Sequence, residues 1–281
     1  MNSLNSQVCA QSDINQINQK KLKAYLGSIG MTHSYQNIAI DHTRIQPVIE
    51  KPVQISSVVP APAPARVVTK QKSVQKSESI KQQIGACTSV VDLKTLLDGY
   101  YDCDLRKTAT NTVFSDGNIE APIMIIGEAP GAEEDASGKP FVGKSGQLVD
   151  NMFQSIGLSR SQNLYISNMI FWRPPGNRPP TAIEIEQCLP FIEKHITLVK
   201  PKILILLGGI AAKTLLRSKE TIIQMRGKSY EFTHTDIDNA IPVLAFYHPA
   251  YLLRSPRQKA VFWQDLLKLK ALMHDKNIAL D

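Results

Sequence analysis

Four short apolar segments constrain the fold of this chain more than any other feature. They lie at residues 122–127, 163–168, 202–207 and 243–247. Runs of this length are typical of buried strands, because helices in globular proteins are longer. Longer segments with helical periodicity separate and flank them, at residues 89–98, 145–156, 181–199, 210–216 and 257–274. This alternation predicts an α/β fold with three αβα layers around a central four-stranded parallel sheet.

Capping residues mark where two of these helices begin. Ser89 has the side chain of an N-cap and precedes the first helical segment. Thr181 is followed three residues later by Glu184, which is the spacing of a capping box. The sequence therefore predicts helix starts at both positions.

Polar motifs follow the first and the last of the predicted strands. Residues 127–131 read Gly-Glu-Ala-Pro-Gly, and residues 247–254 read Tyr-His-Pro-Ala-Tyr-Leu-Leu-Arg. In a parallel α/β sheet the loops after the strands lie along one edge, where ligands bind. We therefore expect the carboxylate of Glu128 and the imidazole of His248 to face one pocket.

These motifs resemble the uracil-DNA glycosylase superfamily, most closely its family-4 or iron–sulfur type. The resemblance covers roughly residues 93–272 and continues through residues 133–143, 165–168, 173–178 and 226–228 in the same order. It implies a uracil-DNA glycosylase fold and a DNA repair enzyme that flips uracil out and hydrolyses its N-glycosidic bond. We expect an abasic site as the product without strand cleavage, because no lysine has an obvious Schiff-base role.

The resemblance implies which residues bind uracil and which cleave its N-glycosidic bond. An enzyme acting on a base stacks on its face and reads its edge, roles that fit Phe141 and Asn168, with Ala129 beside them. His248 is placed to stabilise charge on the departing uracil, and Glu128 to orient water, with Glu134 as a second carboxylate. Taken alone, Phe141 could pack under its loop, Asn168 could cap a strand end and His248 could be structural.

Several further residues are candidate DNA contacts. Leu252 and Leu253 offer an apolar wedge for the gap left by a flipped base, and Arg254 a contact with phosphate or the groove. The alternative for the leucines, that they belong to the core, is expected to hold for one of the two. The other candidates for phosphate binding are Lys144, Ser145, Arg226 and Lys228.

The resemblance also implies a [4Fe–4S] cluster held by four cysteines, and this chain departs from that pattern. The matching positions read Tyr100, Cys103, Trp172 and Cys188, so two thiolates of the usual four remain. We expect no metal site and no cofactor, with packing in place of the cluster and Cys103 and Cys188 as remnants. A cluster with a rearranged ligand, such as Cys87, is the alternative.

The first part of the chain differs in composition from the rest. We expect a short helical segment in residues 1–40, a disordered Pro/Ala/Lys-rich linker in residues 41–86 and the glycosylase domain in residues 87–281. Residues 1–90 carry a net charge of +6, and residues 91–281 carry +1. This basic segment suits attraction to DNA phosphates, recruitment of a protein partner, or simple solvation of a linker.

Composition argues against two further classes, membrane-spanning proteins and small proteins built on a disulfide scaffold. No apolar run approaches the roughly 18 residues of a membrane span, and the cysteines are too few and scattered for a disulfide scaffold. We expect a cytoplasmic, nucleoid-associated monomer without a membrane partner, whose substrate is uracil-containing DNA.

Residues 138–145 match the P-loop pattern G-x-x-x-x-G-K-[ST]. A P-loop leaves its strand directly, whereas the predicted strand here ends near Gly127, and Pro140 removes one amide donor. We therefore expect no nucleotide hydrolysis. The other rival hypothesis is a non-catalytic DNA-binding or scaffold protein on the same fold.

Overall fold

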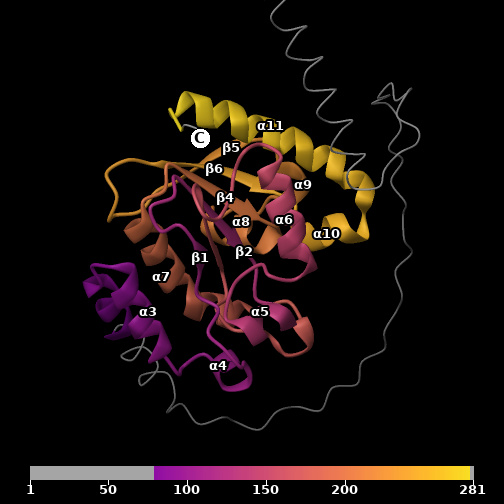
Figure 1. Ribbon diagram of the computed structural model, residues 1–281. Helices are drawn as coiled ribbons and strands as arrows, with labels where there is room; N and C mark the ends of the chain where they lie inside the picture. The colour runs from indigo at the N-terminus through magenta and orange to yellow at the C-terminus, as the bar shows by residue number, and fades with distance from the viewer. Residues whose placement is uncertain (1–78, 279–281) are drawn as a thin grey trace, which may run out of the picture. The chain divides into compact units, whose positions relative to one another are not determined.

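The sheet at the centre of the structure has six strands in the order β1-β3-β2-β4-β6-β5 (Figure 1). This is a computed structural model, and it describes residues 79–278. The strands are β1 Asp116–Gly117, β2 Ile123–Gly127, β3 Leu164–Asn168, β4 Ile203–Leu207, β5 Ser229–Phe232 and β6 Ile241–Phe246.

The four inner strands, β3, β2, β4 and β6, pair in parallel, which confirms the predicted central sheet. The two edge strands are antiparallel to their neighbours and were not predicted. β1 has only two residues, and β5 is mostly exposed except at Phe232. Neither edge strand carries the run of buried apolar side chains that identifies an inner strand from sequence.

Helices cover both faces of the sheet, which confirms the three predicted layers. On one face Met124, Leu204 and Val243 belong to the same buried cluster as residues of α3 (Val90–Asp98), α7 (Ala182–Val199) and α8 (Gly209–Leu215). Figure 1 shows α7 and α3 on the side of the sheet away from α11. This cluster is the larger part of the core.

The opposite face is covered by α6 (Lys144–Gln154) and α11 (Lys259–Asp275). Phe153 of α6 has its ring centroid 6.4 Å from Phe246 of β6 and 6.4 Å from Phe262 of α11. Phe246 and Phe262 meet edge to face at 5.1 Å. Buried aromatic contacts of this kind add to the free energy gained from apolar burial, so they fasten both helices to the sheet.

Shorter helices complete the structure. They are α4 Leu105–Thr108, α5 Ala132–Ser137, α9 Ile222–Met225 and α10 Pro249–Arg254, with 3-10 turns at Pro175–Asn177 and Pro256–Gln258. α5 follows β2 and α10 follows β6, so both lie at the carboxyl edge of the parallel strands. None of the helices within residues 79–278 is long and apolar enough to cross a membrane.

Both predicted helix caps are present. The Ser89 hydroxyl accepts a hydrogen bond from the Asp92 backbone N–H at 3.1 Å. Thr181 and Glu184 form a complete capping box, with the Thr181 N–H donating to Glu184 Oε2 at 2.7 Å. Local sequence therefore determines where α3 and α7 begin.

The folded part of the chain begins earlier than the expected boundary at residue 87. Residues 79–86 are helical, and Ile84 is buried in the same core as α3 and α7. The expectation of a disordered linker is thus wrong for residues 79–86, because Ile84 supplies an apolar anchor. The helix expected in residues 1–40 and the rest of the linker lie outside the described residues.

Candidate active site at the carboxyl edge of the sheet

The ends of the parallel strands bring the two predicted motifs to one edge of the sheet. Gly127, the last residue of β2, pairs with Asn168, the last residue of β3. On the other side of β2 lies β4, whose last residue Leu207 pairs with Phe246, the last residue of the adjacent strand β6. Glu128 and His248 therefore follow strands that end at the same edge, on either side of β4.

Phe141 reaches back to this edge from the loop between α5 and α6. Its backbone has a φ of 55°, and its side chain is buried. A Cβ on Gly127 would lie under 3.0 Å from the Phe141 ring. The Phe141 ring also faces that of His248, with centroids 6.0 Å apart. Gly127 is therefore the glycine that lets an aromatic ring lie against the end of the strand. Ala129, two residues further along the chain, is half-buried.

Asn168 presents its amide beside the Phe141 ring. The residue is 1% exposed, and its Oδ1 atom has no hydrogen-bond partner within residues 79–278. A buried polar atom without a partner costs free energy, and native structures contain few of them. An unpaired acceptor beside an aromatic face is the arrangement expected of a site that binds a planar molecule with N–H donors.

His248 caps α10, and this fixes its tautomer. Its Nδ1 accepts a hydrogen bond from the Ala250 backbone N–H at 3.2 Å. Since Nδ1 is an acceptor, the proton of the neutral ring is on Nε2, which has no acceptor within residues 79–278. Burial, reinforced by the positive charge of Arg254, lowers the pKa of His248 to about 4, against an opposing effect of Glu134. The ring is therefore a neutral donor at physiological pH.

Glu128 is half-buried at the end of β2. Burial raises the pKa of its carboxyl group above the ordinary value, because desolvation disfavours the charged form. Its backbone oxygen accepts from the Ile170 N–H at 3.1 Å, so the chain stays attached to the segment after β3. The Glu128 carboxylate has no hydrogen-bond partner in the described residues, which leaves it available to water or a ligand.

Glu134 has a different role from that of Glu128. Its Oε2 accepts from the Gly131 N–H at 3.0 Å, and its Oε1 accepts from Val142 and Gly143 N–H at 3.0 and 2.9 Å. Three backbone donors occupy this carboxylate. The structure thus places Glu134 as the organiser of the loop that carries Phe141. Its role as a second catalytic carboxylate stays a prediction.

The P-loop-like string is not arranged as a phosphate cradle. α5 separates β2 from residues 138–145, and Gly138 and Gly143 instead end α5 and begin α6. Glu134 takes the amides of Val142 and Gly143, and an anionic ligand would be repelled by that carboxylate. The string therefore does not have the geometry of a P-loop.

Two of the predicted phosphate contacts bind acidic groups of the protein itself. Arg226 donates to both carboxylate oxygens of buried Asp265, at 3.1 and 2.8 Å, and its guanidinium lies 5.5 Å from the Tyr247 ring centroid. Lys228 pairs with Glu220 at 2.8 Å. Arg226 therefore links α11 to the strand end before His248, a role that sequence spacing does not reveal.

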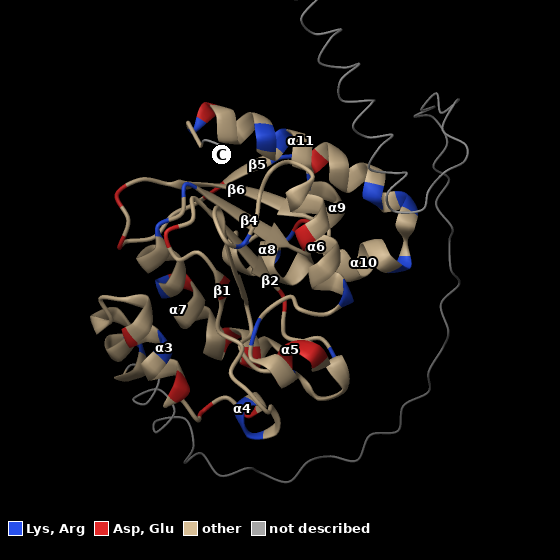
Figure 2. Ribbon diagram, viewed as in Figure 1, with Lys and Arg blue, Asp and Glu red and all other residues tan. Residues whose placement is uncertain are grey.

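The two leucines after His248 have opposite environments. Leu252 is fully buried and belongs to the core, so its prediction as a DNA contact is wrong. Leu253 is 42% exposed, and Arg254 beside it is exposed as well. Lys and Arg gather where α10 leads into α11 (Figure 2). Lys144 is exposed and Ser145 is half-buried at the start of α6.

The four positions that match cluster cysteines lie together in the core. Tyr100 and Trp172 stack with centroids 6.5 Å apart, and the Cys188 thiol hydrogen-bonds to Cys103. Burial raises the pKa of Tyr100 to about 12, so its phenol stays neutral. The Trp172 indole N–H donates to Thr112 Oγ1 at 3.1 Å. Two thiols, a neutral phenol and an indole do not fit a cluster that needs four thiolates.

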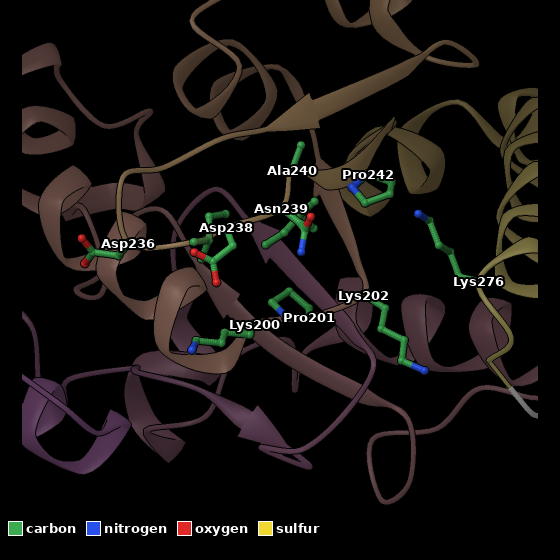
Figure 3. A pocket seen from close by; sticks show the side chains of 11 residues that line it. Lys200, Pro201, Lys202, Asp236, Asp238, Asn239, Ala240, Pro242 and Lys276 are labelled. Atoms are coloured by element: carbon green, nitrogen blue, oxygen red, sulfur yellow. The ribbon is translucent and has the colours of Figure 1, made fainter.

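A separate hollow lies at the other edge of the sheet. It has a volume of about 340 Å³ and is lined by the segments that precede β4 and β6 together with Lys276 (Figure 3). Its lining includes three basic residues, Lys200, Lys202 and Lys276, and two acidic ones, Asp236 and Asp238 (Figure 3). None of the predicted site residues lines it, so this hollow is distinct from the candidate site.

Sequence reasoning missed two residues that organise the site. Arg160 binds the loop of Phe141, and Asp265 binds Arg226. Arg160 is 19 residues from Phe141 in the chain, and Asp265 is 39 residues from Arg226. A charged residue spaced so far from its partner carries no local signal, although the apolar residues around Asp265 in α11 hint at its burial.

This chain is similar to known uracil-DNA glycosylases. The chain matches the model of the Uracil DNA glycosylase superfamily over residues 114–267. It is 38% identical over 182 residues to the type-4 uracil-DNA glycosylase of Archaeoglobus fulgidus, covering 63% of this chain and 90% of that protein. It is 40% identical over 184 residues to the type-4 uracil-DNA glycosylase of Saccharolobus solfataricus, and the match covers 64% of this chain and 84% of that protein. It is also 27% identical over 154 residues to a type-5 enzyme of Pyrobaculum aerophilum, covering 48% and 64%.

Proposed function

The chain belongs to the uracil-DNA glycosylase superfamily, and from this we propose that the carboxyl edge of its sheet binds and excises uracil. The protein is a DNA repair glycosylase, a hydrolase of N-glycosidic bonds. It removes uracil from DNA and leaves an abasic site. The assignment of individual residues to this reaction is our proposal and rests on the geometry above.

The reaction breaks the bond between C1′ of the sugar and N1 of uracil. The bonding electrons leave with uracil, and positive charge develops on the sugar. Water then adds its oxygen to C1′, and its proton balances the charge on the released base. Groups that stabilise either charge in a water-poor site accelerate this step.

Recognition is assigned to Phe141 and Asn168. The flipped uracil stacks on the Phe141 ring, and its N3–H donates to the unpaired Oδ1 of Asn168, while the amide Nδ2 donates to O4. Cytosine has no N3–H and carries a donor at C4, so the same amide discriminates against it. The unpartnered buried oxygen of Asn168 beside an aromatic ring is the observation that carries this proposal.

Catalysis is assigned to His248 and Glu128. The Nε2–H of neutral His248 donates to uracil O2 as negative charge develops there. An ionised Glu128 orients the attacking water and stabilises the cationic sugar. Glu134 does not touch the reacting atoms in this scheme and holds the Phe141 loop instead.

DNA is bound at the same edge. We assign Leu253 to the gap left by the flipped base and Arg254 to a phosphate, with Lys144 and Ser145 at the start of α6 as further contacts. The phosphate contacts predicted for Arg226 and Lys228 are not part of this proposal, since both are engaged by carboxylates.

We propose that the enzyme acts without an iron–sulfur cluster, works as a monomer in the cytoplasm at the nucleoid, and uses part of residues 1–78 to contact DNA or a protein partner. The absence of a cluster is supported by the residues at the four cluster positions, which do not fit one. The role of residues 1–78 in binding is supported by the basic composition of the N-terminal part.

One assay tests the proposed function against a scaffold role. An end-labelled oligonucleotide with a single uracil is incubated with the protein and then heated in alkali, which breaks the strand at an abasic site. Cleavage at the uracil position is expected, with none in a matched oligonucleotide carrying thymine. Intact strands from folded protein would overturn the proposal, and phosphate release from a nucleoside triphosphate would favour the P-loop hypothesis.

A further inference from the structure

Arg160 lies in the connection between α6 and β3 and binds the loop that carries Phe141. Its Nη1 donates to the Pro140 carbonyl oxygen at 2.8 Å, and its Nη2 donates to the carbonyl oxygen of Phe141. The side chain is only 17% exposed. One guanidinium therefore holds two successive carbonyl groups, one of them that of Phe141 itself.

Two carboxylates hold the guanidinium in place. Arg160 Nε donates to Asp150 of α6 at 2.8 Å, and Nη1 donates to Asp116 of β1 at 3.0 Å. The planar guanidinium presents its donors in a fixed fork, so these contacts set its orientation as well as its position. Arg160 thus ties the edge strand, α6 and the Phe141 loop together.

The backbone of Phe141 needs such support. Its φ of 55° lies in the left-handed region, which a residue with a side chain adopts only when its surroundings enforce it. The Phe141 carbonyl also fits against Gly146, where a Cβ would overlap with it. Arg160 and Gly146 therefore fix the carbonyl from two sides, and the ring on the same residue is turned onto Gly127.

We propose that Arg160 is a positioning residue that holds Phe141 in its base-stacking conformation. This inference rests on the proposed function, because it takes Phe141 as the residue that stacks on uracil. Arg160 itself touches neither base nor DNA backbone in this proposal. Its effect on excision passes through the backbone of Phe141.

The substitution Arg160→Lys keeps the positive charge and loses the fork. A lysine cannot hold both carbonyls and both carboxylates, because its ammonium is a single point of donation. We expect single-turnover uracil excision to fall about 100-fold, the loss that a small misplacement of a reacting group can cause. Arg217→Lys is the matched control, since Arg217 is 82% exposed and lies outside the site.

A double-mutant cycle separates positioning from general stability. In a Phe141→Ala background Arg160→Lys is expected to cause less than about a threefold further loss, because the ring that it positions is gone. Affinity for DNA with an uncleavable 2′-fluoro-deoxyuridine is expected to fall, while affinity for undamaged DNA stays within about twofold. Losses that multiply in the cycle, or equal losses on undamaged DNA, would overturn the proposal.

A milder variant covers the case in which Arg160→Lys does not fold. Asp150 is 44% exposed, so Asp150→Ala removes one anchor of Arg160 with little effect on the core. It is expected to lower excision severalfold in the wild-type background and not in the Phe141→Ala background. Excision by the wild-type protein is measured in parallel, so a failure of the proposed function would appear there and not as an effect of Arg160.

Discussion

The amide oxygen of Asn168 and the ring of Phe141 occupy the space in which a side chain on Gly127 would lie. Asn168 and Gly127 face each other at the last paired position of two adjacent parallel strands. A glycine at the end of β2 is thus required by two site residues at once. The carboxyl end of β2 is not only where the catalytic loop begins but also part of the wall of the site.

Gly127→Ala is expected to lower uracil excision about 100-fold, because the new methyl group displaces both Phe141 and Asn168. Single-turnover kinetics on a uracil oligonucleotide measure the loss. Gly85→Ala is the control, since a methyl group on this helical residue would meet no atom within 4 Å apart from its chain neighbours and the backbone of its own helix. Equal rates for Gly127→Ala and the wild type would show that the two side chains do not act at this point.

The pH dependence of excision is expected to follow Glu128 and not His248. Burial raises the pKa of Glu128 above 4.5, so the ionised form, and with it the rate, is lost as the pH falls through that raised value. His248 has a pKa lowered to about 4, and the profile should be flat around 6.5, its ordinary value. Glu128→Gln and His248→Ala are each expected to lower the rate roughly 10²–10⁴-fold. An inflection near 6.5 that disappears in His248→Ala would contradict the neutral-donor role.

Leu252→Ala and Leu253→Ala should separate stability from function. Leu252 is fully buried, so its truncation is expected to cost about 2–5 kcal/mol of unfolding free energy. Leu253 is exposed, and its truncation should change stability by less than about 1 kcal/mol while it slows excision from duplex DNA. Urea denaturation and single-turnover kinetics on both variants provide the two measurements. Unchanged excision by Leu253→Ala would remove this residue from the DNA contact.

Deletion of residues 1–78 is expected to leave single-turnover excision nearly unchanged and to weaken DNA binding. The deletion ends before the helix that contributes Ile84 to the core. Each lost phosphate contact should reduce the slope of log K against log salt by about 0.9 on duplex DNA. Binding titrations from low to moderate salt compare the two forms. Identical slopes would indicate that this segment serves a partner or a linker function.

Iron analysis after anaerobic purification is expected to find no stoichiometric iron. The thiols of Cys103 and Cys188 hydrogen-bond to each other, and Tyr100 and Trp172 fill the other two positions. Visible absorption of the same sample tests for thiolate-bound iron. A brown protein with about four iron atoms per chain would contradict the prediction and point to a rearranged ligand. Replacing Cys87 by Ser would then test whether it is that ligand.

The sequence by itself determined the central sheet, the starts of α3 and α7 and the edge at which the site lies. These features depend on local patterns: short buried runs, capping residues, and loops that follow parallel strands. Glu128 and His248 come to one edge because their strands are parallel, which alternation of strands and helices already implies.

Only the tertiary structure decided which of these side chains bind or pack against other parts of the protein. Arg226 pairs with Asp265, Glu134 binds three backbone amides, Leu252 is in the core and Arg160 holds Phe141. Sequence patterns report the type of a residue and its periodicity, not its distant partners. A charged group between two elements can stabilise the fold or bind a ligand. Which of the two it does depends on contacts that form when segments far apart in the chain pack together.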